Sequence, residues 1–418
     1  MKHFNLGRIR SGKMMSFGVI SCAFIMTLTA CDTYVIKAED LMKDVTSNEV
    51  NTVPLDDAFT SVTADFSLEL FKKTIADEDN AMISPLSVLL ALGMVANGAD
   101  GDTLSQMETV LGGGMKLEQL NEYLYSFMKS LVSEEKAKLK LANSIWVKEG
   151  FPVIKEFLQT NADYYQAAAY GAPFDGTTLD DINNWVNDNT EGLIKKIIDE
   201  IDPSSVMYLI NTVLFDAEWE HKYEVEDVKP DVFTSILGEK QNVSLMSSNE
   251  GWYLRDDAGA TGFIKPYVGQ YQFVALLPNI GVDFHQYASS LTGSRFVSVL
   301  ENAERTMVDA KLPKFKSEYS IGLNGALESL GIVDAFKDTA DFSRLSSLET
   351  YINQVSHKTF IEVDEAGTKA GAVTGVDVSV TSVPPPGYSV ILDRPFLYAI
   401  VDGNTNLPIF IGSMVAES

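Results

Sequence analysis

The apolar pattern of this chain continues without a break from Asp57 to Ser418. No Pro-, Gly- or Ser-rich linker divides this stretch, and it contains no internal repeat. It also lacks the strict alternation of strand and helix that a doubly wound sheet requires. Helical spacing dominates its first half, and strand signals dominate its second half. The pattern therefore predicts one large domain over 57–418, of the α+β class with extensive antiparallel sheet.

Local signals predict the individual elements. The predicted helices are 57–76, 85–95 and 181–198, and the predicted strands are 207–219, 271–281 and 305–315. Ser84 followed by Pro85 marks a helix start, because proline fits the first turn of a helix. Near the C-terminus two apolar runs flank Asp402-Gly403-Asn404, which predicts a β-hairpin.

Residues 1–30 have a different character from the rest of the chain. Four positive side chains and no acid precede an apolar run at 17–28, which ends in Leu28-Thr29-Ala30-Cys31. This order is typical of a secretory signal peptide and is too short to span a membrane. The last four residues resemble a bacterial lipobox, with Cys31 as the lipidated first residue of the mature chain. An ordinary cleaved signal or a buried N-terminal helix is the alternative.

We therefore expect an exported bacterial lipoprotein, anchored to a membrane of the cell envelope or at the cell surface. Residues 31–56 are polar and acidic without clear periodicity, and we interpret them as the lipidated tether. Loss of the signal removes four positive charges, so the net charge changes from −26 to −30. Such an acidic body repels nucleic acid and anionic bilayers, so the expected membrane contact is the N-terminal lipid only.

The usual catalytic motifs are missing. The sequence has no G-x-S-x-G, H-E-x-x-H or phosphate-binding G-x-x-x-x-G-K-[ST] motif. His221, His285 and His357 are too widely spaced to indicate a metal site. The run 112–114 (Gly-Gly-Gly) follows a predicted helix, so it indicates a helix stop. We expect no enzymatic activity, no metal and no cofactor.

The segment 362–387, EVDEAGTKAGAVTGVDVSVTSVPPPG, combines features of a strand and a loop. In an extended chain from 368 onward, alternate residues share a face. The face that is small or apolar throughout consists of Thr368, Ala370, Ala372, Thr374, Val376, Val378 and Val380. Gly371 and Gly375 weaken a permanent strand, and the prolines at 384–386 end any ladder. The segment is either a mobile loop that happens to alternate, or a loop in one state and a central strand in another.

Several motifs together resemble the serpin family. FIEVDEAGTKAGAVT (360–374) is similar to the serpin hinge, an acidic E-x-G-T followed by small residues. Further motifs in family order are NAMISPLSVLLALGMVANGADGDT (80–103), LANSIWV (141–147), INNWVNDNTEGLIKKII (182–198), LINTVLFDAEWEHKY (209–223), LPKFKSEYSIGLNGALESLGIVDAF (312–336), ADFSRLS (340–346) and RPFLYAI (394–400). The likeness covers roughly 57–418.

This resemblance implies a serpin fold, with three mainly antiparallel β-sheets surrounded by helices and 362–387 as an exposed reactive-centre loop. It also implies a suicide-substrate mechanism. A protease cuts the loop, the loop inserts into the largest sheet as a new strand, and the protease stays trapped as its covalent acyl-enzyme.

The resemblance further assigns roles to single residues. The hinge residues are Glu365, Gly367, Thr368, Ala370, Ala372 and Thr374. The shutter, a polar cluster below the opening of the main sheet, consists of Ser84, Ser87, Asn211 and His357. The breach, where insertion begins, consists of Trp219, Lys314 and Glu365. Taken alone, His357 would be interpreted as a satisfied core histidine. The sequence departs from the family pattern at Ala366, Lys369, Gly371 and Val373.

Family spacing places the reactive bond at Thr381-Ser382, with Val380 and Val383 as its neighbours, and the bonds Val380-Thr381 and Ser382-Val383 are the alternatives. No Lys or Arg lies between Thr374 and Asp393, so a small or β-branched side chain would enter the primary pocket of the protease. Such a pocket is elastase-like. We expect a monomer that forms a covalent complex with an elastase-like serine protease. The alternatives are a non-inhibitory serpin that acts as a binding protein, and a surface-anchored hydrolase or glycan-binding lipoprotein.

Overall fold

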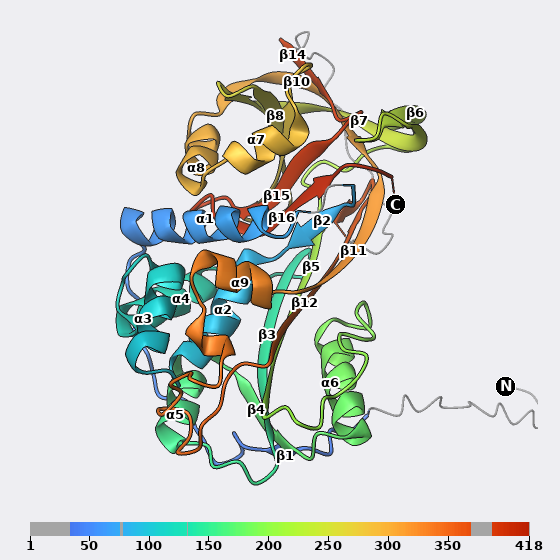
Figure 1. Ribbon diagram of the computed structural model, residues 1–418. Helices are drawn as coiled ribbons and strands as arrows, with labels where there is room; N and C mark the ends of the chain where they lie inside the picture. Colours follow the sequence, from blue (N-terminus) through green and yellow to red (C-terminus); the bar gives the residue numbers. More distant parts are fainter. Residues whose placement is uncertain (1–33, 76–77, 132, 369–386, 418) are drawn as a thin grey trace, which may run out of the picture. The chain divides into compact units, whose positions relative to one another are not determined.

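The computed structural model describes residues 34–75, 78–131, 133–368 and 387–417. The chain forms two compact units, Met1–Val35 and Ile36–Ser418. The predicted signal peptide at 1–30 and Cys31 lie outside the described residues. The described helices and strands all belong to the second unit (Figure 1).

The central element of this unit is a seven-stranded sheet, the main sheet. In spatial order its strands are β1 (Glu39–Asp40), β4 (Ala168–Ala172), β3 (Ala137–Lys148), β5 (Met207–Glu218), β13 (Gly367–Thr368), β12 (Gln354–Val363) and β11 (Phe315–Gly322). Strand β5 is buried along nearly its whole length, as expected for a strand covered on both faces.

A second, nine-stranded sheet packs near the main sheet. Its strands in order are β14 (Tyr388–Ile391), β10 (Glu304–Pro313), β7 (Lys240–Asp256), β8 (Ala260–Pro266), β9 (Tyr271–Pro278), β15 (Phe396–Asp402), β16 (Pro408–Met414) and β2 (Ala81–Ile83), with β6 (Val228–Thr234) paired to β7. Strand β7 pairs with β6 along its first part, with β10 over 245–253 and with β8 along its end, so the ladder is continuous where separate sheets were expected. The predicted C-terminal hairpin is present as β15 and β16.

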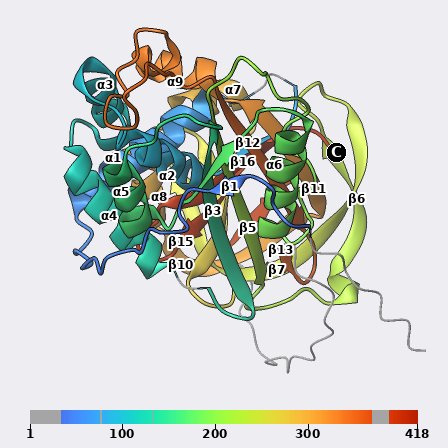
Figure 2. The same ribbon diagram turned by 90° about the horizontal axis from the view of Figure 1, so that it is seen from below.

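Helices cover both faces of the main sheet, and others pack against the second sheet. They are α1 (Asp57–Lys72), α2 (Pro85–Ala96), α3 (Gly101–Gly112), α4 (Leu117–Ser130), α5 (Lys155–Tyr165), α6 (Gly176–Asn189), α7 (Phe284–Ser290), α8 (Gly293–Glu301) and α9 (Asn324–Leu330), with short 3₁₀ turns η1 (Val225–Asp227) and η2 (Asp334–Phe336). Figure 2 shows α6 on one side of β3 and β5, and α2, α4 and α5 on the other side. Every residue of α2 is buried, which explains its uniformly apolar sequence.

Two apolar cores lie on opposite faces of the main sheet. The main core includes Leu209, Val213 and Phe215 of β5, whereas the core beneath α6 includes Tyr208 and Ile210 of the same strand. Odd and even residues of β5 therefore face different cores, as the two-residue period of a strand requires.

Two predicted helices have the wrong bounds. The helix expected over 57–76 ends at Lys72. We expected a helix over 181–198, but α6 spans Gly176–Asn189. It begins earlier because Asp175 caps the amides of residues 177 and 178. It ends earlier because Glu191 and Gly192 have positive φ angles of 51° and 85°, which no helix can continue through. The apolar residues beyond this point are buried without a helix.

The predicted tether also differs from the structure. We expected 31–56 to be a tether, but the folded unit begins at Ile36. Within this segment β1 pairs with the edge strand β4, and the Val53 amide donates to Ser126 Oγ at 2.8 Å. Leu41, Met42 and other apolar side chains of the segment pack against the main core. These residues follow neither a two-residue nor a helical period, so the sequence pattern did not reveal their docking.

Candidate functional site: the root of the loop and the opening of the main sheet

The two central strands of the main sheet are joined at one end only. Strands β5 and β12 pair in parallel from Tyr208 with Gln354 to Asn211 with His357. Strand β5 then continues to Glu218 and β12 to Val363. Over 212–216 and 358–362 the described residues show no ladder between them. The two strands therefore diverge above His357.

At the far end, β13 lies between the diverging strands. Gly367 and Thr368 pair with Glu218 and Ala217 of β5, and Thr368 also pairs with Val363 of β12. A Cβ at Gly367 would lie 2.0 Å from the Ala217 carbonyl oxygen, so only glycine fits this position. The first two residues at the root of the loop are thus already part of the sheet.

Thr368 faces the main core. Its side chain is 2% exposed and hydrogen-bonds the hydroxyl of Tyr267, which is fully buried. Its ladder partner Ala217 belongs to the same core as Phe215. The face that begins with Thr368 is therefore the core-facing one.

A tight turn at 364–366 joins β12 to β13. Asp364 Oδ1 accepts hydrogen bonds from the amides of Ala366 at 2.8 Å and Gly367 at 3.1 Å, and the Asp364 amide donates to the Gly367 carbonyl at 3.0 Å. Burial raises the pKa of the Asp364 carboxyl above its usual value, although these two amide bonds oppose the rise. The hairpin of β12 and β13 is closed by the side chain of its own turn.

The segment that follows β5 donates hydrogen bonds to the three backbone carbonyls of this turn. Trp219 donates from its indole Nε1 to the Asp364 carbonyl at 2.8 Å and from its backbone to the Ala366 carbonyl at 3.0 Å. The Tyr223 amide donates to the Glu365 carbonyl at 3.0 Å. We call residues 219–223 the clamp.

Glu365 has a second partner. Lys314 Nζ lies 2.5 Å from Glu365 Oε2, with 36% and 44% of the two side chains exposed. The Lys314 hydrogen bond lowers the pKa of the Glu365 carboxyl. Because both side chains are partly exposed, this pair contributes about 1 kcal/mol or less. The predicted breach residues Trp219, Lys314 and Glu365 therefore lie together around one turn.

The predicted shutter residues meet where β5 and β12 join. His357 Nε2 accepts from the Ser84 amide at 3.0 Å. Ser87 Oγ donates to Asn211 Oδ1, and the Asn211 amide donates to Asn143. Burial lowers the pKa of the His357 imidazole from 6.5 to about 4, so the ring is neutral at physiological pH.

Comparison with known proteins agrees with this geometry. The family model of the serpins (serine protease inhibitors) matches residues 61–416. The chain belongs to the serpin family. Serpins are generally protease inhibitors, and the fold expected from the sequence is confirmed.

Three proteins illustrate the likeness. Iripin-8 of Ixodes ricinus is 31% identical over 358 residues, which cover 81% of this chain and 89% of that protein. The thermophilic serpin tengpin in its native state has a TM-score of 0.87 and 51% identity, covering 91% of this chain and 99% of that one. Human thyroxine-binding globulin complexed with thyroxine shares the fold, with a TM-score of 0.78 and 22% identity, covering 86% of this chain and 98% of that one.

Tengpin also shows which conformation the described residues resemble. Its latent state matches with a TM-score of 0.79, covering 88% of this chain and 100% of that one. The native state matches better on both the TM-score and the coverage of this chain.

Some predicted residues of this serpin lie outside the described part of the chain. They are the hinge residues Ala370, Ala372 and Thr374, the reactive-bond residues Thr381 and Ser382, their neighbours Val380 and Val383, and Cys31.

Other residues of the site were missed by the sequence reasoning. Asp364 closes the turn, Tyr267 receives Thr368, and Asn143 extends the shutter. An aspartate three residues before Gly367 is a recognisable side-chain-capped turn. Tyr267 and Asn143 gave no such signal, because only the fold brings them to the site.

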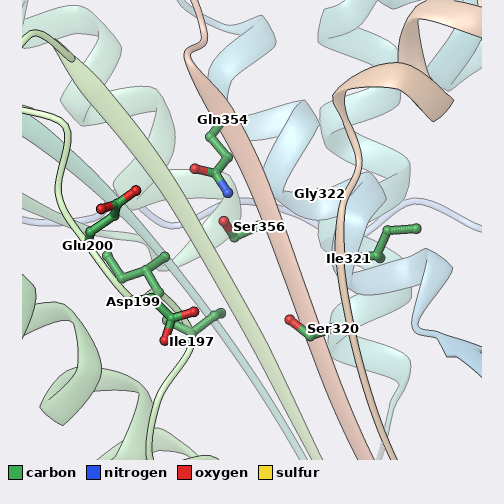
Figure 3. Close-up of a pocket in the computed structure, with 9 residues that line it drawn as sticks. Ile197, Asp199, Glu200, Ser320, Ile321, Gly322, Gln354 and Ser356 are labelled. Carbon is green, nitrogen blue, oxygen red and sulfur yellow. The ribbon is translucent and has the colours of Figure 1, made fainter.

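A polar cavity of about 290 Å³ lies on the face of the main sheet near its joined end. Figure 3 shows Gln354 and Ser356 on β12, Ser320 on β11, and Asp199 and Glu200 from the segment after α6. Its lining contains no histidine or cysteine.

In the described ranges no group of three or more His, Cys, Asp or Glu is placed to hold a metal. Among the helices described, none is long and apolar enough to cross a membrane.

Proposed function

We propose that this serpin inhibits serine proteases as a suicide substrate. The observation that carries this proposal is the β12–β13 hairpin, whose strand β13 lies between β5 and β12 at one end of the stretch, 212–216 and 358–362, over which no described ladder joins them. The entropy cost of forming a new strand pair falls mainly on its first contacts. Later residues then extend a ladder that already exists. The structure already contains those first contacts.

The covalent step follows from the chemistry of serine proteases. The protease serine Oγ attacks the carbonyl carbon of Thr381, the peptide bond to Ser382 breaks, and the amine of Ser382 leaves with a proton. An ester then links Thr381 to the protease. Cleavage frees the loop from β14, so the residues after Thr368 can enter the sheet.

The observed register defines where the inserted residues would lie. Continuing the pairing of Thr368 with Ala217 and Val363 places residue 370 between Phe215 and Ile361. By the same count, Ala372 lies between Val213 and Thr359, and Thr374 reaches the shutter beside Asn211 and His357. Small side chains fit these core-facing positions without overpacking. Insertion past this point would have to open the parallel pairing of β5 with β12.

We propose that the target proteases are elastase-like. The residues at 380–383 are Val-Thr-Ser-Val, which suit a shallow, uncharged primary pocket. The test is incubation with an elastase and, separately, with trypsin, followed by electrophoresis in SDS and mass mapping of the cut bond. We expect an SDS-resistant complex with elastase and cleavage near Thr381. A stable complex with trypsin alone would contradict the assigned specificity.

The same experiment separates the inhibitor from a non-inhibitory binding serpin. A binding serpin would be cut by elastase without a covalent adduct and without a gain in thermal stability. That result, obtained with fully folded protein, would overturn the inhibitor proposal.

We also propose that the protein is an exported lipoprotein anchored through Cys31. The support is the charge and apolar order of residues 1–30 and the lipobox-like 28–31. Radiolabelled palmitate should be incorporated into the wild-type protein and not into the Cys31→Ser variant. Equal incorporation by both proteins would contradict the anchor.

A further inference from the structure

A buried ion pair lies beside the site and has no role in the mechanism above. Lys265 of β8 is 2% exposed, and its Nζ lies 2.8 Å from Glu250 Oε1 of β7. Ser248 Oγ donates to the same carboxylate oxygen at 2.6 Å. A lysine this deeply buried loses its hydration, so its partners must satisfy its donors.

The other contacts of the Lys265 ammonium are all on the clamp. It donates to the His221 carbonyl at 3.1 Å and lies 4.2 Å from the centre of the Tyr223 ring. It also lies 5.3 Å from the centre of the Trp219 ring. The Lys265 ammonium therefore contacts Trp219 and Tyr223, which donate to the loop root, and it also binds the backbone between these two residues.

These contacts connect the ion pair to the hairpin turn. Trp219 and Tyr223 together hold the carbonyls of Asp364, Glu365 and Ala366. The Lys265 ammonium lies against the rings of the same two residues. We propose that Lys265, held by Glu250, is a positioning residue for loop insertion, because it keeps the clamp donors aligned with the turn. This inference rests on the proposed inhibitory function.

A role in geometry explains the choice of charged residues better than a role in stability. A buried ion pair generally stabilises a fold no more than apolar side chains of similar volume. An apolar side chain at 265, however, could not bind the His221 carbonyl. The ion pair thus supplies a directional hydrogen bond to the clamp backbone. Apolar packing at the same site would suffice for folding but would not supply this bond.

The expected consequence concerns the fate of the acyl-enzyme. Insertion of the cut loop competes with hydrolysis of the ester between the loop and the protease. If the clamp is loose, the hairpin turn is less often in place when the loop is cut, and insertion starts later. More of the inhibitor should then be released as cleaved product. Loss of one net hydrogen bond predicts a rise of roughly two- to tenfold in the ratio of cleaved inhibitor to complex.

The test compares two double variants. Glu250→Gln with Lys265→Met removes both charges together, so that no unpaired buried charge remains. Asp256→Asn with Arg295→Met is the matched control, because this pair also involves β7, at 2.7 Å, and contacts neither the clamp nor the turn. Each protein is reacted with elastase, and the bands of complex, cleaved inhibitor and unreacted inhibitor are quantified.

We expect the Glu250/Lys265 variant to be cut at the wild-type rate and to raise the ratio of cleaved inhibitor to complex. The control variant should leave this ratio unchanged. A purely structural role would increase the unreacted band without changing the ratio. An unchanged ratio in the Glu250/Lys265 variant, or an equal rise in the control, would overturn the proposal.

A second measurement needs no protease. Hydrogen exchange of the Trp219 and Tyr223 amides should be faster in the Glu250/Lys265 variant than in the wild-type and control proteins. Unchanged protection of both amides would overturn the positioning role even if the protein proved not to be an inhibitor. If the wild-type protein forms no complex with any serine protease while the amide effect is present, the inhibitory function has failed and the support of the clamp has not.

Discussion

At the scale of single residues, the site depends on a few tightly packed positions where one residue type fits. Gly367 touches the backbone of β5, and Thr368 fills a buried position against Tyr267. His357 is buried and neutral at the point where the two central strands meet. The atoms around each of these residues leave no room for a larger or differently charged side chain. Substitutions at these positions therefore test the assigned packing.

Gly367→Ala should impair inhibition. The new Cβ would lie 2.0 Å from the Ala217 carbonyl oxygen, and such overpacking costs about 1–3 kcal/mol. The β13 pairing should be lost, and the ratio of cleaved inhibitor to complex should rise roughly tenfold. Gly322→Ala in β11 is the control, since nothing lies within 4 Å of its added Cβ. A wild-type ratio in Gly367→Ala would contradict the assigned packing.

The pH dependence of stability should carry a contribution from His357. Its pKa falls from 6.5 in the unfolded chain to about 4 in the folded protein, so the unfolded chain binds the proton more tightly. The contribution is complete above pH 6.5 and is lost as the pH falls to about 4, by roughly 3 kcal/mol. Denaturant unfolding across this range should show a shallower decline for His357→Gln. Parallel pH profiles would contradict the assignment.

At the scale of elements, the sequence predicted best what depends on local pattern. The C-terminal hairpin, the start of α2 and the predicted stop at 112–114 follow from turn residues and periodicity, and Gly113 indeed adopts a left-handed conformation with φ 59°. The end of α6 could not be predicted, because apolar residues beyond Thr190 pack without helical structure. The docking of residues 36–55 depends on the edge of β4, which is distant in sequence.

The candidate site likewise contains residues that the sequence predicted and contacts that it did not. The breach and shutter residues were identified by likeness to the family, and the structure places them in two clusters. The pre-formed β13 and the clamp could not be predicted, because they arise from contacts between the loop root and residues over a hundred positions away.

The alternation of the loop should distinguish its two faces. If the register of β13 continued on insertion, Ala372 would face the main core beside Val213, and Val373 would face the opposite side. Ala372→Arg would bury a charge, which costs several kcal/mol, so the loop should be cut without forming a complex. Val373→Arg should lose less complex formation than Ala372→Arg, because its neighbour Lys358 on the opposite face is only half-buried. Equal behaviour of the two variants on SDS gels would contradict this register.

At the scale of the whole molecule, the main sheet is incomplete at its centre. Two cores lie on its faces, and strands β5 and β12 are joined at one end by direct pairing and at the other through β13. The described residues match native tengpin more closely than latent tengpin. In the proposed inhibitory mechanism, completion of the central ladder would supply the driving force.

The most direct test of this claim is hydrogen exchange before and after cleavage of the loop. Peptides that cover 212–216 of β5 and 358–362 of β12 should become strongly protected in the cleaved protein, because an inserted strand would occupy their open ladder positions. Peptides from β8 and β9 serve as an internal reference that should not change. Unaltered exchange at 212–216 and 358–362 after complete cleavage would show that the loop does not insert, and the central claim would be wrong.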